Sequence, residues 1–320
     1  MNSLILGVNG QDGILLSRHL VAQGQNVFGI GVQNQASPFL ESSIKYIQAN
    51  ICETDKIMEL VSTTKVEHIY NLAGLSSVAE SFLNPDKSFE VNFHAVERIL
   101  NSLYSDTHRN IRFFQASSSE MFGKIEVEPQ DETTTFNPQS PYAEAKVRSH
   151  RLCSEFRRGG HFVTCGILFN HESVYRPTSF VSRKITSAVA RISLGLQRDL
   201  TLGNLEATRD WGAARDYVQG MHQILQHDSP EDFVVATGIG HTVKDLAMVA
   251  LKHVGLEHQF EELIKIDETL KRPIEIRKTL GNPQKIQNLL GWKAKTNFID
   301  LINEMVDHDI ALFKDSNLNR

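Results

Sequence analysis

The chain has 320 residues, of which 41% are apolar and 22% charged, a mixture typical of a globular protein with one large domain or two closely packed ones. Its net charge of −5, without any basic block, argues against nucleic-acid binding, and no apolar run is long enough for a signal peptide or a membrane span. Three widely separated cysteines, Cys52, Cys153 and Cys165, indicate neither disulfides nor a metal site, so we expect a cytoplasmic protein.

The first half of the chain alternates between two kinds of segment. Apolar segments rich in β-branched and aromatic residues predict strands over residues 4–8, 26–30, 68–73, 111–116 and 161–169. The amphipathic segments between them predict helices near residues 12–23, 55–63, 86–104 and 142–157. Apolar strands that alternate with helices indicate an α/β protein with a Rossmann-like, doubly wound parallel sheet covered on both faces.

Beyond about residue 170 the alternation loosens. Helical periodicity recurs at 180–195, 243–254 and 298–313, and short apolar segments, DLTLG and DFVVATG, interrupt it. We therefore expect a dinucleotide-binding Rossmann domain over 1–170, to which the segment of about 205–240 returns. Residues 171–204 and 241–320 are expected to form a smaller C-terminal substrate-binding lobe.

A glycine-rich segment, Gly7-Val-Asn-Gly10-Gln-Asp-Gly13, joins the first predicted strand to the first predicted helix. Such glycines permit a tight turn and close approach of a pyrophosphate, and the helix N-terminus offers it unpaired N–H groups. The spacing is GxxGxxG rather than GxGxxG, and a plain turn packed against a helix is the alternative. The strand–loop–helix context favours dinucleotide binding.

The end of the second strand does not decide which dinucleotide is bound. An acidic residue there binds the ribose 2′-hydroxyl of NAD, and an arginine accommodates the 2′-phosphate of NADP. Residues 29–35, GIGVQNQ, contain neither. Gln33 and Asn34 are able to hydrogen-bond either form of the ribose.

Two further motifs carry acid–base groups. Three serines and a glutamate follow the fourth predicted strand in QASSSEMFGK (115–124), and Tyr142 and Lys146 are four residues apart in SPYAEAK. Ser140 and Pro141 predict a helix start, which places both side chains on one helical face. A nearby ammonium lowers the pKa of a tyrosine, which then takes a proton from an alcohol as hydride leaves the same carbon. An exposed pair of helical neighbours is the alternative interpretation.

Together these motifs resemble the extended short-chain dehydrogenase/reductases, and within them the chain is most similar to the GDP-mannose 4,6-dehydratase family. The resemblance covers almost the whole chain. The segments that carry it are GVNGQDG (7–13), NLAG (71–74), QASSSEMFG (115–123), SPYAEAK (140–146), GILFNHES (166–173), FVSRKI (180–185), LGNLEATRDWGAARDYV (202–218) and RPIE (272–275).

The resemblance implies an NADP-dependent lyase that converts GDP-mannose to GDP-4-keto-6-deoxy-mannose. In that reaction Tyr142 takes the proton of the C4 hydroxyl, Lys146 lowers the pKa of the tyrosine and holds the nicotinamide ribose, and Ser118 hydrogen-bonds the C4 oxygen. Glu120 removes the C5 hydrogen and helps water to leave from C6, and hydride returns to C6. A reductase or epimerase needs no such acid, so Glu120 is the discriminating residue.

The resemblance also implies two sets of binding residues. The cofactor set is Gly7, Asn9, Gly10, Gln11, Asp12, Gly13, Gln33, Asn50, Ile51, Leu72, Ala73, Gly74, Ser76, Tyr142, Lys146, His171 and Arg176. The set for the nucleotide-sugar substrate is Ser77, Asn170, Lys184, Gly203, Arg209, Arg272 and Glu275. Guanidinium groups suit diphosphate oxygens. The alternative for His171 is a buried, hydrogen-bonded histidine without a ligand, and the alternative for the arginines is a surface salt bridge.

One departure from the family affects two predictions. The family's arginine pair after the second strand is replaced by Val32 and Gln33, so NADP is the implied cofactor but NAD is not excluded. We expect a homodimer through the helices at 142–157 and 86–104, and not a tetramer. The alternative functions are an NAD(P)-dependent 4-keto reductase or epimerase acting on a related nucleotide sugar, or a non-catalytic nucleotide-binding scaffold.

Overall fold

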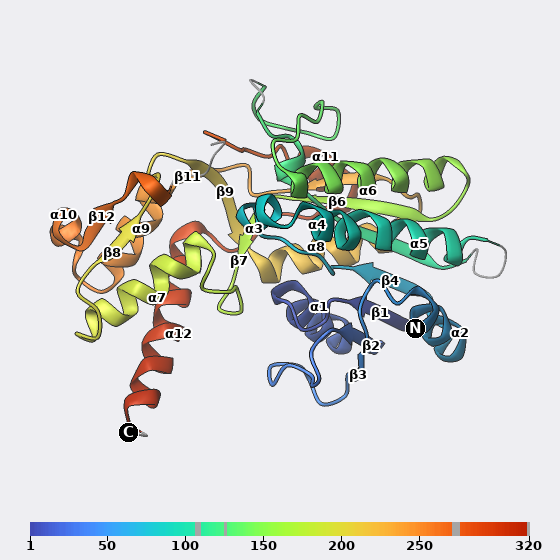
Figure 1. Cartoon of the computed structure of the whole chain (residues 1–320), viewed down its shortest axis with the longest axis horizontal. Helices are drawn as coiled ribbons and strands as arrows, with labels where there is room; N and C mark the ends of the chain where they lie inside the picture. Colours follow the sequence, from blue (N-terminus) through green and yellow to red (C-terminus); the bar gives the residue numbers. More distant parts are fainter. Residues whose placement is uncertain (106–109, 125–126, 271–275, 319–320) are drawn as a thin grey trace.

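The computed structural model describes residues 1–105, 110–124, 127–270 and 276–318 (Figure 1). Its centre is a seven-stranded sheet in the order β10-β6-β5-β4-β1-β2-β3, in which all neighbouring strands are parallel. The strands are β1 (Asn2–Leu6), β2 (Asn26–Gly31), β3 (Lys45–Gln48), β4 (His68–Asn71), β5 (Arg112–Ser118), β6 (Val163–Leu168) and β10 (Asp232–Val235). The strand order reverses at β1, which confirms the predicted doubly wound sheet.

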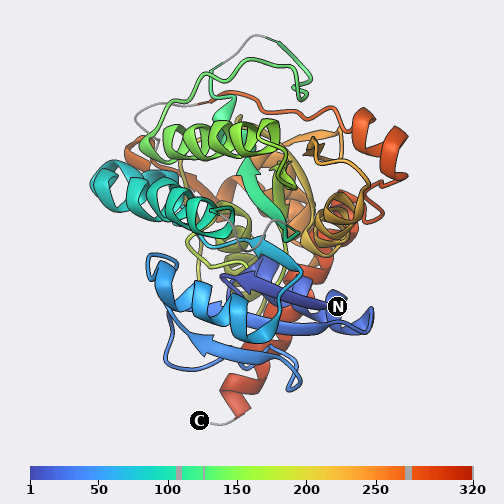
Figure 2. The same ribbon diagram turned by 90° about the vertical axis from the view of Figure 1, so that its right-hand side faces the viewer.

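Helices cover both faces of the sheet because successive strand side chains point to opposite sides. Leu4 and Leu6 belong to the apolar cluster on one face and Ile5 to the cluster on the other, and all three are fully buried. The first face is covered by α2 (Thr54–Thr64), α5 (Ala95–Leu103) and α6 (Pro141–Arg158), which lie side by side in Figure 2. The second is covered by α1 (Gln11–Ala22), α8 (Ala214–Gln226) and α11 (Gln284–Leu290).

The remaining elements form a smaller lobe, drawn at the left of Figure 1. Its helices are α7 (Val181–Ser193), α9 (Val243–His253), α10 (Phe260–Leu263) and α12 (Phe298–Leu318). Its strands form a three-stranded sheet, β11-β9-β7, and a parallel pair, β12-β8. They are β7 (Asn170–Glu172), β8 (Leu200–Leu202), β9 (Thr208–Ala213), β11 (Gly240–Thr242) and β12 (Ile264–Ile266). One apolar cluster joins α7, α9 and α12.

The structure differs from the predicted elements in the segment near 86–104 and in several short elements that were not predicted, among them the strands β3, β7, β9, β11 and β12. The segment near 86–104 is not one helix, because a π-helical turn interrupts it; the elements there are α3 (Val78–Leu83), α4 (Pro85–Phe89), the π-helical turn (Glu90–His94) and α5. The short strand β3 was not predicted, since its residues are exposed or half-buried at the edge of the sheet and lack a continuous apolar run. Three 3₁₀ turns complete the described elements: Ser119–Met121, Glu257–Gln259 and Glu268–Leu270. Among these described helices, none has the length and apolar character that crossing a membrane requires.

Candidate active site

The glycine loop shows which glycines the fold itself requires. Gly7 has a φ of +87°, and a Cβ added to it would lie 2.8 Å from the backbone of Ala73. A Cβ on Gly13 would lie 2.4 Å from the carbonyl oxygen of Gly7. Gly10, which caps α1, is exposed and its added Cβ would meet no atom closer than 3.4 Å. The fold therefore fixes two of the glycines, and the third leaves open space in front of the helix N-terminus.

Buried polar groups connect this loop to β7. His171 Nε2 lies 2.8 Å from Asp12 Oδ2, and its Nδ1 lies 2.7 Å from the carbonyl oxygen of Phe169. Gln11 donates to the carbonyl oxygen of His171 at 3.0 Å and accepts from Ser173 at 2.9 Å. Burial disfavours both charges, but the attraction of the pair outweighs it, so the pKa of His171 is raised and that of Asp12 lowered. The ring predicted to contact the cofactor is thus hydrogen-bonded at both nitrogens beneath the loop.

The other predicted cofactor residues follow the strand ends. Asn9 donates to Gln33 Oε1 at 3.0 Å, which brings the glycine loop to the end of β2. Asn50 caps its own turn by accepting from the amide of Cys52 at 3.0 Å, and Ile51 behind it is buried. Arg176 pairs with the buried Glu172 at 3.2 Å. Leu72, Ala73, Gly74 and Ser76 follow β4, beside β1 at the same edge of the sheet.

A residue that the sequence analysis did not find holds the loop after β4. The side-chain amide of Asn92 accepts from the amide of Leu75 and donates to its carbonyl oxygen, both at 3.2 Å. Asn92 lies in the π-helical turn, a distortion that often marks functional sites. An added Cβ on Gly74 would lie 2.7 Å from Asn92 Oδ1 and 3.6 Å from Lys146 Nζ, so this loop passes close to the site.

The four predicted catalytic residues come together at the end of β5 and the start of α6. The hydroxyl of Ser118 accepts from the amide of Glu120 at 3.2 Å and hydrogen-bonds the phenol of Tyr142. Lys146 Nζ donates to the carbonyl oxygen of Ala116 at 2.9 Å and lies 5.9 Å from the centroid of the Tyr142 ring. Ser140 caps α6 by accepting from the amide of Ala143 at 3.1 Å, as the sequence predicts.

Burial dominates the titration of this pair. It raises the pKa of Tyr142 to about 12, against the Ser118 hydrogen bond, and the Glu120 carboxylate adds to the rise. Burial also lowers the pKa of Lys146 to about 8. The expected lowering of the tyrosine pKa is therefore absent in the protein alone, because the ammonium is turned to Ala116 and both groups lie out of water.

A second buried polar chain lies behind the catalytic residues. Ser117 Oγ lies 3.0 Å from His150 Nδ1, and His150 Nε2 lies 3.5 Å from Asp232 Oδ2. Arg157 ends the chain with hydrogen bonds of 2.7 and 2.5 Å to the Asp232 carboxylate. Ligand atoms of His150, Cys165 and Asp232 lie within 4.8 Å of one another, but Arg157 already engages both carboxylate oxygens. Lys146 and His150, one turn apart on α6, thus hold consecutive residues of β5.

The predicted substrate residues lie in the lobe and the adjoining loops. Asn170 opens β7, and Arg209, buried in β9, donates to the carbonyl oxygen of Thr208 at 2.8 Å. Lys184 donates to the carbonyl oxygen of Thr201 at 2.8 Å, which brings it to β8 next to Gly203. Ser77 caps α3. Arg272 and Glu275 lie outside the described residues.

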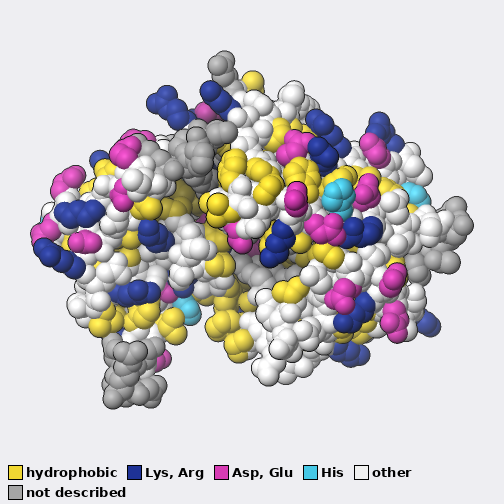
Figure 3. Space-filling model, in the orientation of Figure 1, with side chains coloured by type: hydrophobic (Ala, Val, Ile, Leu, Met, Phe, Trp, Pro, Cys, Tyr) yellow, Lys and Arg dark blue, Asp and Glu magenta, His cyan; other side chains and the backbone are white. Residues whose placement is uncertain are grey.

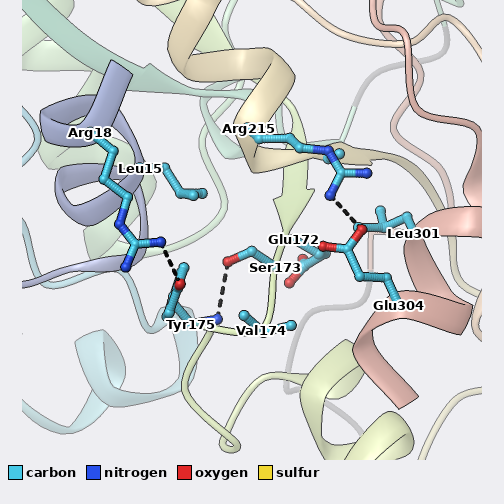
Figure 4. A pocket seen from close by; sticks show the side chains of 10 residues that line it. Leu15, Arg18, Glu172, Ser173, Val174, Tyr175, Arg215, Leu301 and Glu304 are labelled. Carbon is cyan, nitrogen blue, oxygen red and sulfur yellow. Dashed lines mark hydrogen bonds and ion pairs between the residues drawn. The ribbon is translucent and has the colours of Figure 1, made fainter. Parts of the chain in front are cut away.

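A separate hollow of about 210 Å³ lies between α1, the segment after β7, the start of α8 and α12 (Figure 4). It is lined by Leu15, Arg18, Glu172, Ser173, Val174, Tyr175, Ala213, Arg215, Leu301 and Glu304. Arg18 donates to the hydroxyl of Tyr175 at 2.8 Å on one wall, and Arg215 pairs with Glu304 on the other. No predicted site residue lines this hollow.

Comparisons with known proteins show the family to which the chain belongs. The family model described as GDP-mannose 4,6 dehydratase matches residues 4–305. GDP-mannose 4,6 dehydratase 2 of Arabidopsis thaliana is 39% identical over 331 aligned residues, which cover 98% of this chain and 87% of that protein. The human GDP-mannose 4,6 dehydratase is 35% identical and covers 98% of this chain and 92% of its own length.

Solved structures share the fold at lower identity. The UDP-glucose 4-epimerase of Thermotoga maritima has a TM-score of 0.86 at 20% identity, covering 99% of this chain and all of that one (100%). DesIV, a dTDP-glucose 4,6-dehydratase of Streptomyces venezuelae solved with NAD, has a TM-score of 0.85 at 20% identity and covers 96% of each chain. RMD of Pseudomonas aeruginosa, solved with NADPH, has a TM-score of 0.81 at 20% identity and covers 97% of this chain and 100% of that one.

The doubly wound sheet, the glycine loop and the Ser118, Tyr142 and Lys146 group define an extended short-chain dehydrogenase/reductase. The match over residues 4–305 is more specific than the fold. The chain belongs to the GDP-mannose 4,6-dehydratase family, and it is a nucleotide-sugar 4,6-dehydratase of the hydro-lyase class.

The buried ammonium of Lys146 should destabilise the protein. Its pKa falls from 10.5 to about 8 on folding. Below pH 8 the folded chain therefore carries a buried charge whose free-energy cost is lower in the unfolded chain. We expect Lys146→Met to raise the free energy of unfolding at pH 7 by up to about 3 kcal/mol. As the pH rises from 8 toward 10.5, the folded wild type has lost this proton while the unfolded chain retains it. The wild type therefore gains stability, and the difference in free energy of unfolding between Lys146→Met and the wild type narrows.

Urea unfolding at pH 7 and at about pH 9.5 measures this gap in free energy between variant and wild type. Lys56→Met, at an exposed position, is the control; a gap for Lys146→Met that does not change with pH would contradict the account.

Proposed function

We propose that this protein converts GDP-mannose to GDP-4-keto-6-deoxy-mannose, with loss of water across C5 and C6 and movement of hydride from C4 to C6 within one site. The observation that carries the proposal is Glu120, which sits beside Ser118 and Tyr142 in a chain of the GDP-mannose 4,6-dehydratase family. Oxidation of an alcohol needs only the hydroxyl, the tyrosine and the lysine, whereas elimination also needs a base and an acid.

The residues fit a nicotinamide dinucleotide. Gly10 leaves open space at the N-terminus of α1, where backbone N–H groups suit a diphosphate, and the loop after β4 passes within reach of Lys146. When bound, the nicotinamide supplies the hydride acceptor for C4 and the donor for C6. The family resemblance implies NADP, and solved structures of the same fold hold NAD or NADPH. His171, bonded to Asp12, and Arg176, paired with Glu172, are assigned to the cofactor site by the family resemblance.

Tyr142 takes the proton of the C4 hydroxyl in the proposed reaction. Its buried phenol has a raised pKa of about 12, so the proton transfer depends on groups that stabilise the phenolate. Ser118 is one, because its hydroxyl hydrogen-bonds the phenol, and it also reaches the C4 oxygen. The family resemblance assigns the same role to Lys146, whose ammonium lies 5.9 Å from the centre of the ring and donates to Ala116 in the protein alone.

Glu120 performs the elimination. The ketone formed at C4 acidifies the C5 hydrogen, and the Glu120 carboxylate takes this hydrogen as a proton. The same carboxyl then gives its proton to the C6 hydroxyl, which leaves as water. The return of hydride to C6 is balanced by a proton to C5, equivalent to the one that Tyr142 took from the C4 hydroxyl. The side chain is only half-buried, and its place after β5 is fixed by the hydrogen bond from its amide to Ser118. One carboxyl therefore serves as base and then as acid.

We propose the lobe as the nucleotide-sugar site. Arg209 and Lys184 are cations on β9 and α7, next to the three-stranded sheet and the β12-β8 pair, and they suit the diphosphate. Asn170 opens β7 and Ser77 follows β4 as the cap of α3, and both suit the sugar; Gly203, directly after β8, is assigned to the nucleotide. Arg272 and Glu275 are assigned to the same site on the family pattern alone.

Product analysis tests the function. The full chain, with GDP-mannose and a trace of either dinucleotide, should form a keto sugar nucleotide that is lighter by one water, without net consumption of NADPH. In the Glu120→Gln variant the rate should fall by about 10²-fold or more, with C4 still oxidised, because only elimination loses its base. Glu59→Gln, an exposed change on α2, should leave the activity unaffected.

Two outcomes of this experiment would contradict the proposal. Full activity of Glu120→Gln would remove that residue from the mechanism. Reduction or epimerisation at C4, with stoichiometric use of NAD(P)H, would assign the protein to the alternative class of nucleotide-sugar enzyme.

We propose a homodimer through α6 and the helices before it. These helices form the outer layer of one face of the sheet (Figure 2), and α3 packs against α6. Apolar side chains gather on the face in Figure 3, above its centre, and Phe82 and Leu83 of α3 are 38% and 80% exposed. Exposed apolar surface of this kind is a feature of subunit interfaces.

Light scattering of the eluting protein tests the dimer. The wild type should have twice the chain mass of 36.0 kDa. Leu83→Glu should shift the protein to the monomer, because it introduces a charge into the interface, whereas Leu312→Glu on α12, 49% exposed, should not. A monomeric wild type, or equal dissociation by the two variants, would argue against this interface.

A further inference from the structure

The end of β2 holds the residues that meet the adenine-side ribose of a dinucleotide in a doubly wound sheet. In this chain β2 ends at Gly31, and the next residue, Val32, is 58% exposed and apolar. A Cβ added to Gly31 would lie 3.1 Å from Gln33 Oε1 and 3.0 Å from the hydroxyl oxygen of Tyr46. The groups at the strand end are therefore the Gln33 amide and the Tyr46 phenol.

Neutral hydrogen bonds fix Gln33 in this place. Asn9 of the glycine loop donates to Gln33 Oε1 at 3.0 Å and to the carbonyl oxygen of Gln35 at 3.1 Å. It also accepts from the amide of Ser37 at 2.9 Å, and Tyr46 donates to the carbonyl oxygen of Gln33. The glycine loop and the loop after β2 are thus joined by hydrogen bonds whose donors and acceptors are all uncharged.

The loop after β2 supplies no cation. None of residues 31–44, all of which the structure describes, is lysine or arginine. The next residue, Lys45, pairs in register with Phe28, three positions before the end of β2. Its ammonium lies 5.0 Å from the centroid of the Phe28 ring, which directs the charge away from the carboxyl edge of the sheet. At that edge Gln48 stands opposite Gly31 and donates to Asn34 at 2.9 Å.

The neighbouring charges do not replace this missing cation. Arg18 is engaged elsewhere, because its guanidinium donates to the carbonyl oxygen of Phe39 at 2.6 Å and to the hydroxyl of Tyr175 at 2.8 Å. Beside the loop after β3, the Glu53 carboxylate accepts from the amide of Asn50 at 2.6 Å and so adds negative charge. Lys56 lies next to Glu53, at 3.8 Å from its carboxylate.

A 2′-phosphate and a 2′-hydroxyl make opposite demands on such a pocket. The phosphate carries a charge of about −1.5 to −2, and its strongest partners are guanidinium and ammonium groups. A ribose diol is neutral, and both amides and phenols hydrogen-bond it. Given the proposed function, in which a nicotinamide dinucleotide occupies the glycine loop, we infer that this chain selects NAD over NADP, with Gln33 as the residue that faces the ribose.

Titration calorimetry of the full chain with NAD⁺ and with NADP⁺ tests the inference without reference to turnover. NAD⁺ should bind more tightly by about tenfold or more, the difference expected when a phosphate lacks one charged partner. NADP⁺ binding as tightly as NAD⁺, or more tightly, would overturn the inference and leave the proposed dehydratase intact. Binding of neither dinucleotide would overturn both.

A charge placed at the same position supplies the matched variant. Gln33→Arg should tighten NADP⁺ binding by about tenfold and shift the preference from NAD⁺ toward NADP⁺, and the gain for NADP⁺ should shrink as salt is added. Ser42→Arg adds the same charge to an exposed part of the same segment, away from the strand end, and should change neither affinity. An equal gain in both variants, or no gain in Gln33→Arg, would show that position 33 does not face the ribose.

Discussion

The attachment of α6 to the end of β5 is the constraint on which the rest of the site depends. Lys146 donates to the carbonyl oxygen of Ala116, and His150, one turn later, lies 3.0 Å from the hydroxyl of Ser117. Two consecutive residues of the strand are thus held by one face of one helix. Ser118 follows directly, so its distance from Tyr142 on the same helix is set by this attachment. The buried ammonium of Lys146 lowers the stability of the folded protein at neutral pH. A residue that costs stability in this way fits a role in catalysis rather than in folding.

A second set of contacts joins the glycine loop to the smaller lobe. The segment after β6 turns directly into β7, whose His171 and the following Ser173 bond to Asp12 and Gln11 at the start of α1. β7 also pairs with β9, the strand that carries Arg209. The glycine loop and the lobe therefore share one hydrogen-bonded junction.

Much of this arrangement follows from the sequence because its signals are local. The strand–loop–helix order places the glycine loop, and Ser140-Pro141 followed by a spacing of four places Tyr142 and Lys146 on one face of α6. The remaining features depend on distant partners. Asp232 meets His150 only because β10 joins the sheet beside β6, and Asn92 reaches Leu75 only because the helix is distorted there.

The pKa of Tyr142 illustrates a different limit of sequence reasoning. The spacing to Lys146 predicts proximity, and the ring and ammonium are indeed 5.9 Å apart. Whether proximity lowers the pKa depends on burial and on where the ammonium is hydrogen-bonded, and neither follows from spacing. The same holds for Gln33, whose residue type is visible in the sequence but whose attachment to Asn9 is a property of the fold.

The central claim is that oxidation at C4, elimination and reduction at C6 occur on one sugar within one site. Transfer of a deuterium label tests it most directly. With GDP-mannose that carries deuterium at C4, NMR of the product should find the label at C6 of the same molecule, without loss to an added pool of unlabelled dinucleotide. Label that appears in the free dinucleotide, or its absence from C6, would contradict the claim.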